Sequence, residues 1–232
     1  MSDLAVEISN LEFGWSAEAP VLKIQAFEVG ARERVFLKGP SGSGKSTLLG
    51  VISGVLFGFS GSVRVMDHDL SHMSASQRDK MRADQLGVIF QLFNLVPYLS
   101  VVQNVTLPLR FSPARRARVG NDMDAEARRL LSRLGLEGEA VLARRVSDLS
   151  VGQQQRVAAA RALIGGPRLV IADEPTSALD DDARDKFIAL LSDEVARTDA
   201  ALLFVSHDGA LASQFDRSVD LSAINEAGVT TC

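Results

Sequence analysis

Residues 34–47 read RVFLKGPSGSGKST, an apolar run followed by a glycine-rich stretch. The segment GPSGSGKST, residues 39–47, matches the P-loop pattern G-x-x-x-x-G-K-S/T, and an apolar helical pattern follows it. Its glycines, Gly39, Gly42 and Gly44, allow backbone N–H groups to close around a phosphate that a Cβ atom would obstruct. The stretch therefore predicts an α/β fold of the P-loop NTPase type, with a nucleotide bound where a buried strand ends.

Two short segments carry the predicted chemistry of nucleotide hydrolysis. Lys45 can reach the β- and γ-phosphates, and the Ser46 hydroxyl can ligate Mg²⁺. In RLVIADEP, residues 168–175, an apolar strand ends in Asp173, the position from which a P-loop enzyme holds Mg²⁺. Glu174 is predicted to point the other way on that strand, where it could accept a proton from an attacking water. The other loop positions predicted to contact the nucleotide are Pro40, Ser41, Ser43 and Thr47.

Short runs rich in Val, Ile, Leu and Phe mark the predicted strands, at residues 4–9, 34–39, 86–90, 169–173 and 201–206. Such runs, separated by helical patterns, are typical of strands buried on both faces of a mostly parallel sheet. Helical patterns follow two of them, at 45–56 and 181–197. The early segments at 4–9, 21–29 and 60–66 indicate a more antiparallel part.

About 80 residues between the strands at 86–90 and 169–173 have mainly helical patterning, including an amphipathic helix at 124–136 that ends at Gly135. We expect one domain over residues 1–232. Its α/β core would comprise residues 1–91 and about 165–232, and a helical subdomain would occupy about 92–164. The cluster Arg110, Arg115, Arg116 and Arg118 is expected to form a solvated face.

The composition excludes several classes of protein. A net charge of −4 argues against a protein that mainly binds nucleic-acid backbone. The single cysteine, Cys232, rules out an internal disulfide framework and suits the cytosol. The start of the chain does not resemble a signal peptide. Residues 47–63 carry no charge, but four glycines interrupt them and they fall short of the roughly 20 apolar residues that a membrane span needs. We therefore expect a chain that does not itself cross a membrane.

Taken in order, the motifs resemble those of the nucleotide-binding subunits of ABC transporters. GPSGSGKST is similar to their Walker A motif and LVIADE to Walker B. LSVGQQQR, residues 149–156, resembles the signature motif, and SALD, residues 177–180, resembles the D-loop. Gln91 lies where that family has its Q-loop, and His207 where it has its switch histidine. Trp15 takes the position of an aromatic that stacks on adenine, with Phe13 as the rival ring.

The resemblance implies an ATPase that uses ATP and Mg²⁺. Ser46, Gln91 and Asp173 would hold Mg²⁺, while Glu174 and His207 would position the attacking water. Two subunits, identical or similar, would meet head to tail with each ATP between the P-loop of one and the signature helix of the other. Ser150 can cap that helix and bind a γ-phosphate oxygen, because the helix dipole favours an anion there. The residues that would act across the dimer are Ser150, Gly152, Gln153 and, in the D-loop, Asp180.

One residue departs from the usual signature motif. The family usually has two glycines after the signature serine, and here Val151 takes the first place. A helical first-turn φ is negative and suits valine, so the backbone need not be strained. The branched side chain could still crowd the γ-phosphate or the facing chain. We hypothesise that hydrolysis is slowed.

The run FQLFNLVPYLSVVQNVTLPL, residues 90–109, is similar to its counterpart in lipoprotein-release and macrolide- or peptide-export ATPases, except that Gln103 replaces the usual Glu. Its apolar residues would receive a short helix of an integral membrane permease at the cytoplasmic face of the inner (plasma) membrane. The cargo could be a lipoprotein, peptide, drug or lipid. The alternative is an ATPase that drives transmembrane signalling or cell-envelope remodelling without transporting a solute. A binding module without catalysis is disfavoured because Glu174 and His207 are both present.

Overall fold

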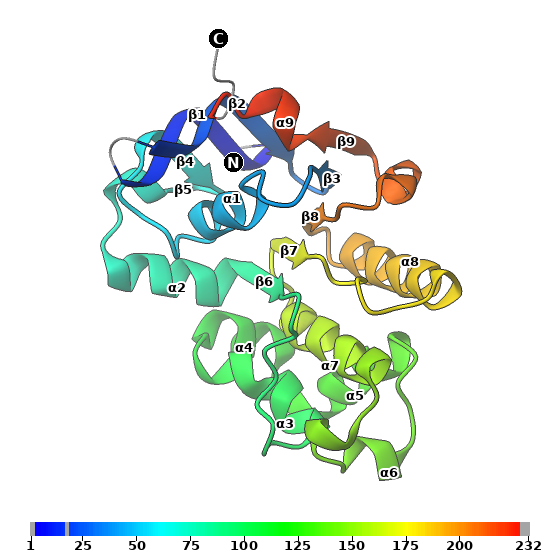
Figure 1. Cartoon of the computed structure of the whole chain (residues 1–232). Helices are drawn as coiled ribbons and strands as arrows, with labels where there is room; N and C mark the ends of the chain where they lie inside the picture. The colour runs from blue at the N-terminus through cyan, green and yellow to red at the C-terminus, as the bar shows by residue number, and fades with distance from the viewer. Residues whose placement is uncertain (1–2, 17–18, 228–232) are drawn as a thin grey trace. The chain divides into compact units, whose positions relative to one another are not determined.

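The computed structural model describes residues 3–16 and 19–227, and the chain divides into two compact units (Figure 1). The first unit contains the chain up to Arg82 and from Ala201 onward, and the second contains Ala83–Ala200. Both parallel and antiparallel strand pairs are present, so the predicted α/β class is confirmed. The single domain with a subdomain at 92–164 stays a prediction, and Cys232 lies outside the described residues.

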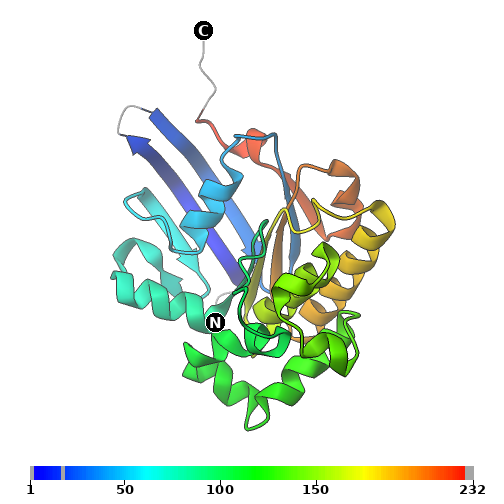
Figure 2. The ribbon, with the colours of Figure 1, turned by 60° about the horizontal axis from the view of Figure 1, so that its bottom comes forward.

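An antiparallel sheet of order β2-β1-β4-β5 lies in the first unit. Strands β1 (Leu4–Ser16) and β2 (Ala19–Gly30) pair as one long hairpin (Figure 2), and β4 (Ser60–Val65) and β5 (His68–Asp69) continue the sheet. On β1, Ile8, Leu11 and Phe13 are buried while Ser9 and Glu12 are exposed. This alternation gives the sheet one apolar face. The predicted antiparallel part is confirmed.

Three parallel strands of the first unit lead toward the phosphate-binding loop: β8 (Ala201–Val205), β3 (Arg34–Lys38) and β9 (Arg217–Asp220), in the order β8-β3-β9. Phe36, Phe204 and Phe215 pack around β3, with ring centroids 5.0–6.2 Å apart. Because β3 is buried and ends at Lys38, residues 39–44 begin at the carboxyl end of a rigid strand. Strand β9, with only one strongly apolar residue, has too weak a pattern to be predicted.

The helices of the first unit are short, and the longest of them, α2 (Ala75–Gln85), extends past Arg82, where this unit ends. Helix α1 (Lys45–Ile52) ends before the predicted residue 56 because the chain turns at Gly54, where φ is +67°. Helix α2 and helix α9 (Leu221–Ile224) were not predicted. Short 3₁₀ turns lie at Leu70–His72 and Gly209–Gln214.

The second unit combines two parallel strands with helices. Strands β6 (Leu86–Ile89) and β7 (Leu169–Asp173) pair in parallel, as expected. Helix α8 (Asp181–Arg197) has the predicted bounds, and α5 (Met123–Arg133) ends before Gly135, whose φ is +73°. The other helices are α3 (Val101–Thr106), α4 (Pro113–Val119), α6 (Glu139–Leu142) and α7 (Val151–Leu163), with 3₁₀ turns at Leu107–Arg110 and Val146–Asp148.

Arg115 on α4 corrects the expectation of a solvated arginine face. Its side chain is buried, and its guanidinium donates to the carbonyl of Ala162 at 2.7 Å, to that of Leu86 at 3.1 Å and to that of Ile164. Burial lowers the pKa of Arg115 to about 10. Carbonyl groups at the end of a helix lack partners within it, so the C-terminal end of α7 supplies the acceptors that make this burial tolerable.

No helix in residues 3–16 and 19–227 combines the length and the apolar character that crossing a membrane requires.

Candidate functional site

The loop after β3 has the shape expected of a phosphate cradle. Gly42 and Gly44 have φ of +81° and +97°, a conformation that favours glycine. A Cβ atom on Gly39 would lie 2.7 Å from Ser43 Oγ, so the loop closes too tightly for a side chain there. Within the described part of the chain the buried Ser43 hydroxyl has no hydrogen-bond partner. An unpaired hydroxyl donor inside a glycine-lined loop fits an anionic ligand.

Lys45 at the start of α1 is folded back onto this loop. Its Nζ atom donates to the carbonyl of Gly39 at 2.8 Å and to that of Pro40 at 2.9 Å, and its side chain is only 9% exposed. Two neutral carbonyls are weaker partners for an ammonium group than phosphate oxygens, since hydrogen bonds between two ions are stronger. The ammonium group thus lies beside the cradle, where phosphate oxygens could replace the two carbonyls as its partners. Ser46 and Thr47 follow on the first turn of α1.

Trp15 and Phe13 near the end of β1 lie in different environments. Phe13 is buried and meets the Trp15 ring edge-on, with centroids 5.3 Å apart. Trp15 is 70% exposed and lines an open hollow of about 410 Å³ together with Glu12, Pro20 and Ser60. Of the two candidate rings, Trp15 is therefore the one with a face available for stacking.

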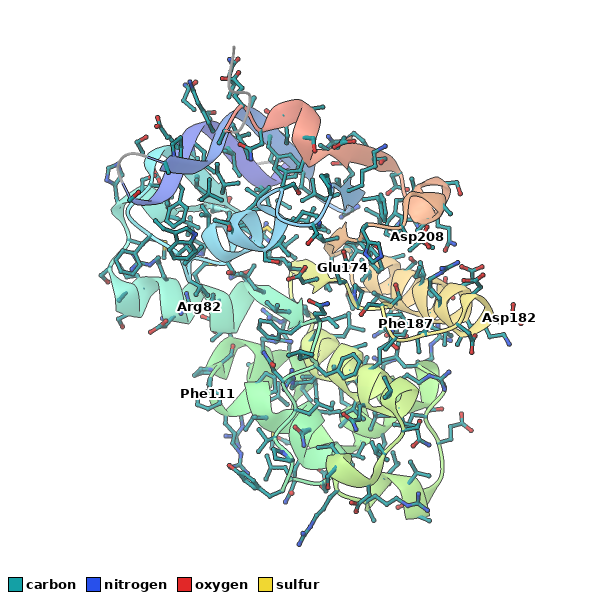
Figure 3. The ribbon with its side chains drawn as sticks, viewed as in Figure 1. Arg82, Phe111, Glu174, Asp182, Phe187 and Asp208 are labelled. Atoms are coloured by element: carbon teal, nitrogen blue, oxygen red, sulfur yellow. The ribbon has the colours of Figure 1, made fainter. Side chains whose placement is uncertain are left out.

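The two acidic residues after β7 differ in backbone conformation. Asp173 ends the strand, and Glu174 follows it (Figure 3). The φ of Glu174 is +46°, in the left-handed region that residues other than glycine rarely adopt. The prediction that Glu174 lies on the strand is therefore wrong, because the strand ends at Asp173. Such a conformation costs on the order of 1–3 kcal/mol and is common at functional sites.

The start of α7 is capped as its sequence predicts. Ser150 Oγ accepts from the backbone N–H of Gln153 at 3.3 Å, while Gln153 Oε1 accepts from the N–H of Ser150 at 3.0 Å. This is a reciprocal capping box. A Cβ atom on Gly152 would lie 3.6 Å from Leu179 of the predicted D-loop. Gln153, expected to face a nucleotide, therefore also completes the cap.

The segment after β6 has a fixed backbone. Asn104, fully buried on α3, exchanges hydrogen bonds with both backbone groups of Val96, at 2.8 and 3.0 Å. Arg161 of α7 donates to the carbonyls of Phe93 and Asn94, at 2.5 and 2.6 Å, and burial lowers its pKa. Both of these loop residues have positive φ, of +59° and +49°. Arg161 was missed because its partners are 67 and 68 residues away, whereas Asn104 was missed although its partner Val96 is only eight residues away.

Exposed apolar side chains lie on this same segment. Leu92 and Tyr98 are 83% and 75% exposed, and Phe90 is partly exposed beside the exposed Gln91. Helix α3, which follows, begins with a second capping box, formed by Ser100 and Gln103. Gln103 thus caps the helix through its amide, in place of the carboxylate usual at this position. The pattern S-x-x-Q before an apolar run is a signal that could have predicted both boxes.

The predicted site residues fall into two groups, one in each unit. The first unit holds Trp15, residues 39–47 and His207, which follows β8 in an exposed position. The second holds Gln91, Asp173, Glu174, Ser150, Gly152, Gln153 and Asp180. Asp180 caps α8 by accepting from the N–H of Ala183 at 2.8 Å. No cluster of three or more His, Cys, Asp or Glu side chains suited to a metal ion occurs among the residues described.

Comparison with known proteins identifies the family. Residues 22–177 match the family described as "ABC transporter". The chain belongs to this family. Its P-loop, Gln91, signature helix and Asp173 lie within the matched residues, while Trp15, Asp180 and His207 lie outside them. As a member of the ABC transporter family, the chain is an ATP-binding ATPase subunit.

Relatives of similar length support this assignment. The chain is 44% identical over 219 residues to the lipoprotein-releasing system ATP-binding protein LolD of Anaeromyxobacter dehalogenans (strain 2CP-C), with 93% of this chain and 90% of the relative covered. It is 38% identical over 225 residues to LolD of Hydrogenovibrio crunogenus (strain DSM 25203 / XCL-2), covering 96% and 95%. A solved dimer of the ATP-binding cassette MJ0796 in a post-hydrolysis state, bound to ADP and Pi, matches with a TM-score of 0.82. Its sequence is 34% identical, and 93% of each chain is covered.

Proposed function

We propose that residues 39–47 bind the phosphates of ATP and that Trp15 stacks on its adenine. The unpaired Ser43 hydroxyl, the left-handed glycines and the exposed Trp15 ring support this assignment. Lys45 would exchange the carbonyls of the loop for the β- and γ-phosphate oxygens. Ser46, Gln91 and Asp173 offer the oxygen ligands that Mg²⁺ prefers. When bound, Mg²⁺ would neutralise charge on the phosphates, while Glu174 and His207 position the attacking water.

The start of α7 carries the proposal that two copies share each ATP. Its capping box satisfies the N–H groups of Ser150 and Gln153, and those of Val151 and Gly152 are available to an anion in front of the helix. In the proposed dimer this anion is the γ-phosphate held by the P-loop of the other copy. The solved cassette MJ0796, a dimer with ADP and Pi, supports this arrangement. ATP would then close the dimer, and hydrolysis would let it open.

The solution mass of Glu174→Gln, measured by light scattering with and without ATP–Mg²⁺, tests this proposal. The variant keeps the shape of the side chain and one accepting oxygen but removes the proposed base, so ATP should remain unhydrolysed. We expect a monomer without ATP and a dimer with it.

Two further variants on the Glu174→Gln background serve as controls. Lys45→Ala should remain monomeric with ATP because the phosphates lose their cation, and Ser150→Ala should dimerise more weakly. A Glu174→Gln chain that stays monomeric at saturating ATP would contradict the shared site.

We further propose that the chain powers a lipoprotein-releasing permease, with residues 90–98 as the docking surface. The LolD relatives support the choice of cargo. Leu92 and Tyr98 project outward while Asn104 and Arg161 hold the backbone beneath them, so little conformational entropy is lost when a partner binds. Arg161 also joins this segment to α7, the helix whose N-cap is Ser150. A peripheral position on the cytoplasmic face of the inner membrane follows from this proposal.

Co-purification with the permease subunits of a lipoprotein-releasing system tests the docking surface. The double variant Leu92→Ala/Tyr98→Ala should lower permease affinity by about 10- to 100-fold, because two exposed apolar anchors are removed. Its ATP binding should not change. Phe57→Ala is the matched control, since Phe57 is 66% exposed but lies in the other unit. Equal loss in the control would contradict the assignment.

A further inference from the structure

The C-terminal segment Asp220–Ala227 runs beside β2, outside the residues that match the family. Ile24 and Asn225 form an antiparallel bridge, and the N–H of Glu226 donates to the carbonyl of Lys23 at 2.8 Å. The Glu226 carboxylate accepts from Gln25 Nε2 at 2.6 Å. Both the backbone and a side chain therefore fix this segment, which we call the C-terminal strap, along the edge of β2.

Asn225 of the strap reaches the phosphate-binding loop. Its Nδ2 atom donates to the carbonyl of Val21 at 3.0 Å and to that of Ser43 at 3.3 Å. Its Oδ1 atom accepts from the N–H of Lys23 at 2.8 Å and from that of Ala227 at 3.2 Å. Two carbonyls and two N–H groups around one amide leave only one orientation for its oxygen and nitrogen. The side chain is therefore a fully bonded link between β2 and the loop.

The link fixes the direction of one peptide group in the cradle. A trans peptide is planar, so the N–H of Gly44 points opposite to the carbonyl of Ser43. Because Asn225 holds that carbonyl on the β2 side, the Gly44 N–H is turned away from β2. Gly44 is the last residue before α1, where backbone N–H groups meet an anion. Because Gly44 has no Cβ atom, this peptide can rotate more easily than others unless something holds it, and here its φ is +97°.

We propose that Asn225 is a positioning residue, which orients the Ser43–Gly44 peptide for the phosphates of ATP. This role rests on the proposed function of residues 39–47. In this role Asn225 acts through its hydrogen bond to the loop and not by contact with the nucleotide. Loss of its amide leaves the peptide free to rotate, so the cradle must be ordered each time ATP binds.

Calorimetric titration of the full-length chain with ATP–Mg²⁺, well below the unfolding temperature, tests the role. We expect Asn225→Ala to raise the Kd about tenfold, the usual scale for a lost hydrogen bond. Asn225→Leu keeps the branched shape of the side chain without its polar atoms and should weaken binding equally, which separates loss of the amide from collapse of the strap. A merely structural role would lower the unfolding temperature and leave the Kd of the folded chain unchanged, and that result overturns the proposal.

Two further variants separate the possible failures. Glu226→Ala removes a side-chain bond of the same strap without touching the loop, so its Kd should stay at the wild-type value. An equal rise in Glu226→Ala would assign the effect to the docking of the strap and overturn the role of Asn225. Lys45→Ala tests the phosphate site itself. If Lys45→Ala binds ATP as tightly as the wild type does, both the proposed function and the role of Asn225 are overturned. If Lys45→Ala binds weakly while Asn225→Ala binds like the wild type, only the role of Asn225 is overturned.

Discussion

Val151 does not strain the backbone at the start of α7, so any effect of this residue comes from its side chain. It is the first residue of α7, it does not have a positive φ, and it is 49% exposed. Valine is therefore tolerated without strain at the point where the proposed γ-phosphate approaches. The isopropyl group stands beside the N–H groups that would bind this anion, so crowding is the physical reason for which we expect slow hydrolysis.

Replacing Val151 tests whether this crowding limits turnover. Val151→Gly should raise steady-state ATP turnover about fivefold, which corresponds to relief of about 1 kcal/mol in the transition state. Val151→Ala should give most of this gain, because it removes the branch without adding backbone freedom. Turnover and ATP affinity that both equal those of the wild type would show that the substitution is neutral.

At the scale of elements, α7 is held at both of its ends. Ser150 and Gln153 cap its start, and two arginines of α4 take the carbonyls at its end. Arg118 donates to Gly165 at 2.7 Å, beside the buried Arg115. Cations at a helix C-terminus are stabilised by the helix dipole. The position of the signature motif thus depends on residues at the far end of its helix.

Removal of Arg115 should destabilise this arrangement. Arg115→Met should lower the free energy of unfolding by about 3 kcal/mol, because buried carbonyls of Leu86, Ala162 and Ile164 lose their donor. Urea denaturation measures the change. Arg116→Met, on the exposed side of the same helix, should stay within about 0.5 kcal/mol of the wild type. Similar losses in both variants would show that burial of Arg115 is not responsible.

What the sequence predicts correctly is local, and what it misses depends on contacts between distant segments. The strand–loop–helix around Lys45 and the capping by Ser150 follow from neighbouring residues. Arg115 was expected in solvent because its acceptors are 29 to 49 residues away. Asn225 has no motif around it, and its partners are about 200 residues away. For Glu174, the end of the strand at Asp173 was predicted correctly, but no sequence pattern indicates that the next residue has a positive φ.

On the scale of the whole molecule, each unit contains carboxylates held by arginines. In the first, Glu33 pairs with Arg217 at 2.6 Å, and the hydrogen bond from Arg217 lowers the pKa of Glu33. In the second, Glu194 is 1% exposed. Burial by itself raises its pKa, but hydrogen bonds from Arg133 and Arg197 outweigh burial and lower it. Both carboxylates therefore bind protons less readily in the folded chain than in the unfolded one.

Acid should consequently unfold the protein through these groups. A carboxylate whose pKa is lowered by folding stabilises the folded chain when the pH lies above the pKa of the unfolded state, here 4.5. This contribution disappears as the pH falls through the lower pKa of the folded state. We expect the free energy of unfolding, measured by urea denaturation, to decline below about pH 5. Glu194→Gln should lower it by about 1.5 kcal/mol at pH 7, since the partly exposed Arg129, Arg133 and Arg197 lose the buried anion that they share, and should also flatten the decline. Glu137→Gln, an exposed carboxylate of the same unit, should alter neither. A decline of undiminished slope in Glu194→Gln would mean that carboxylates elsewhere in the chain control acid unfolding.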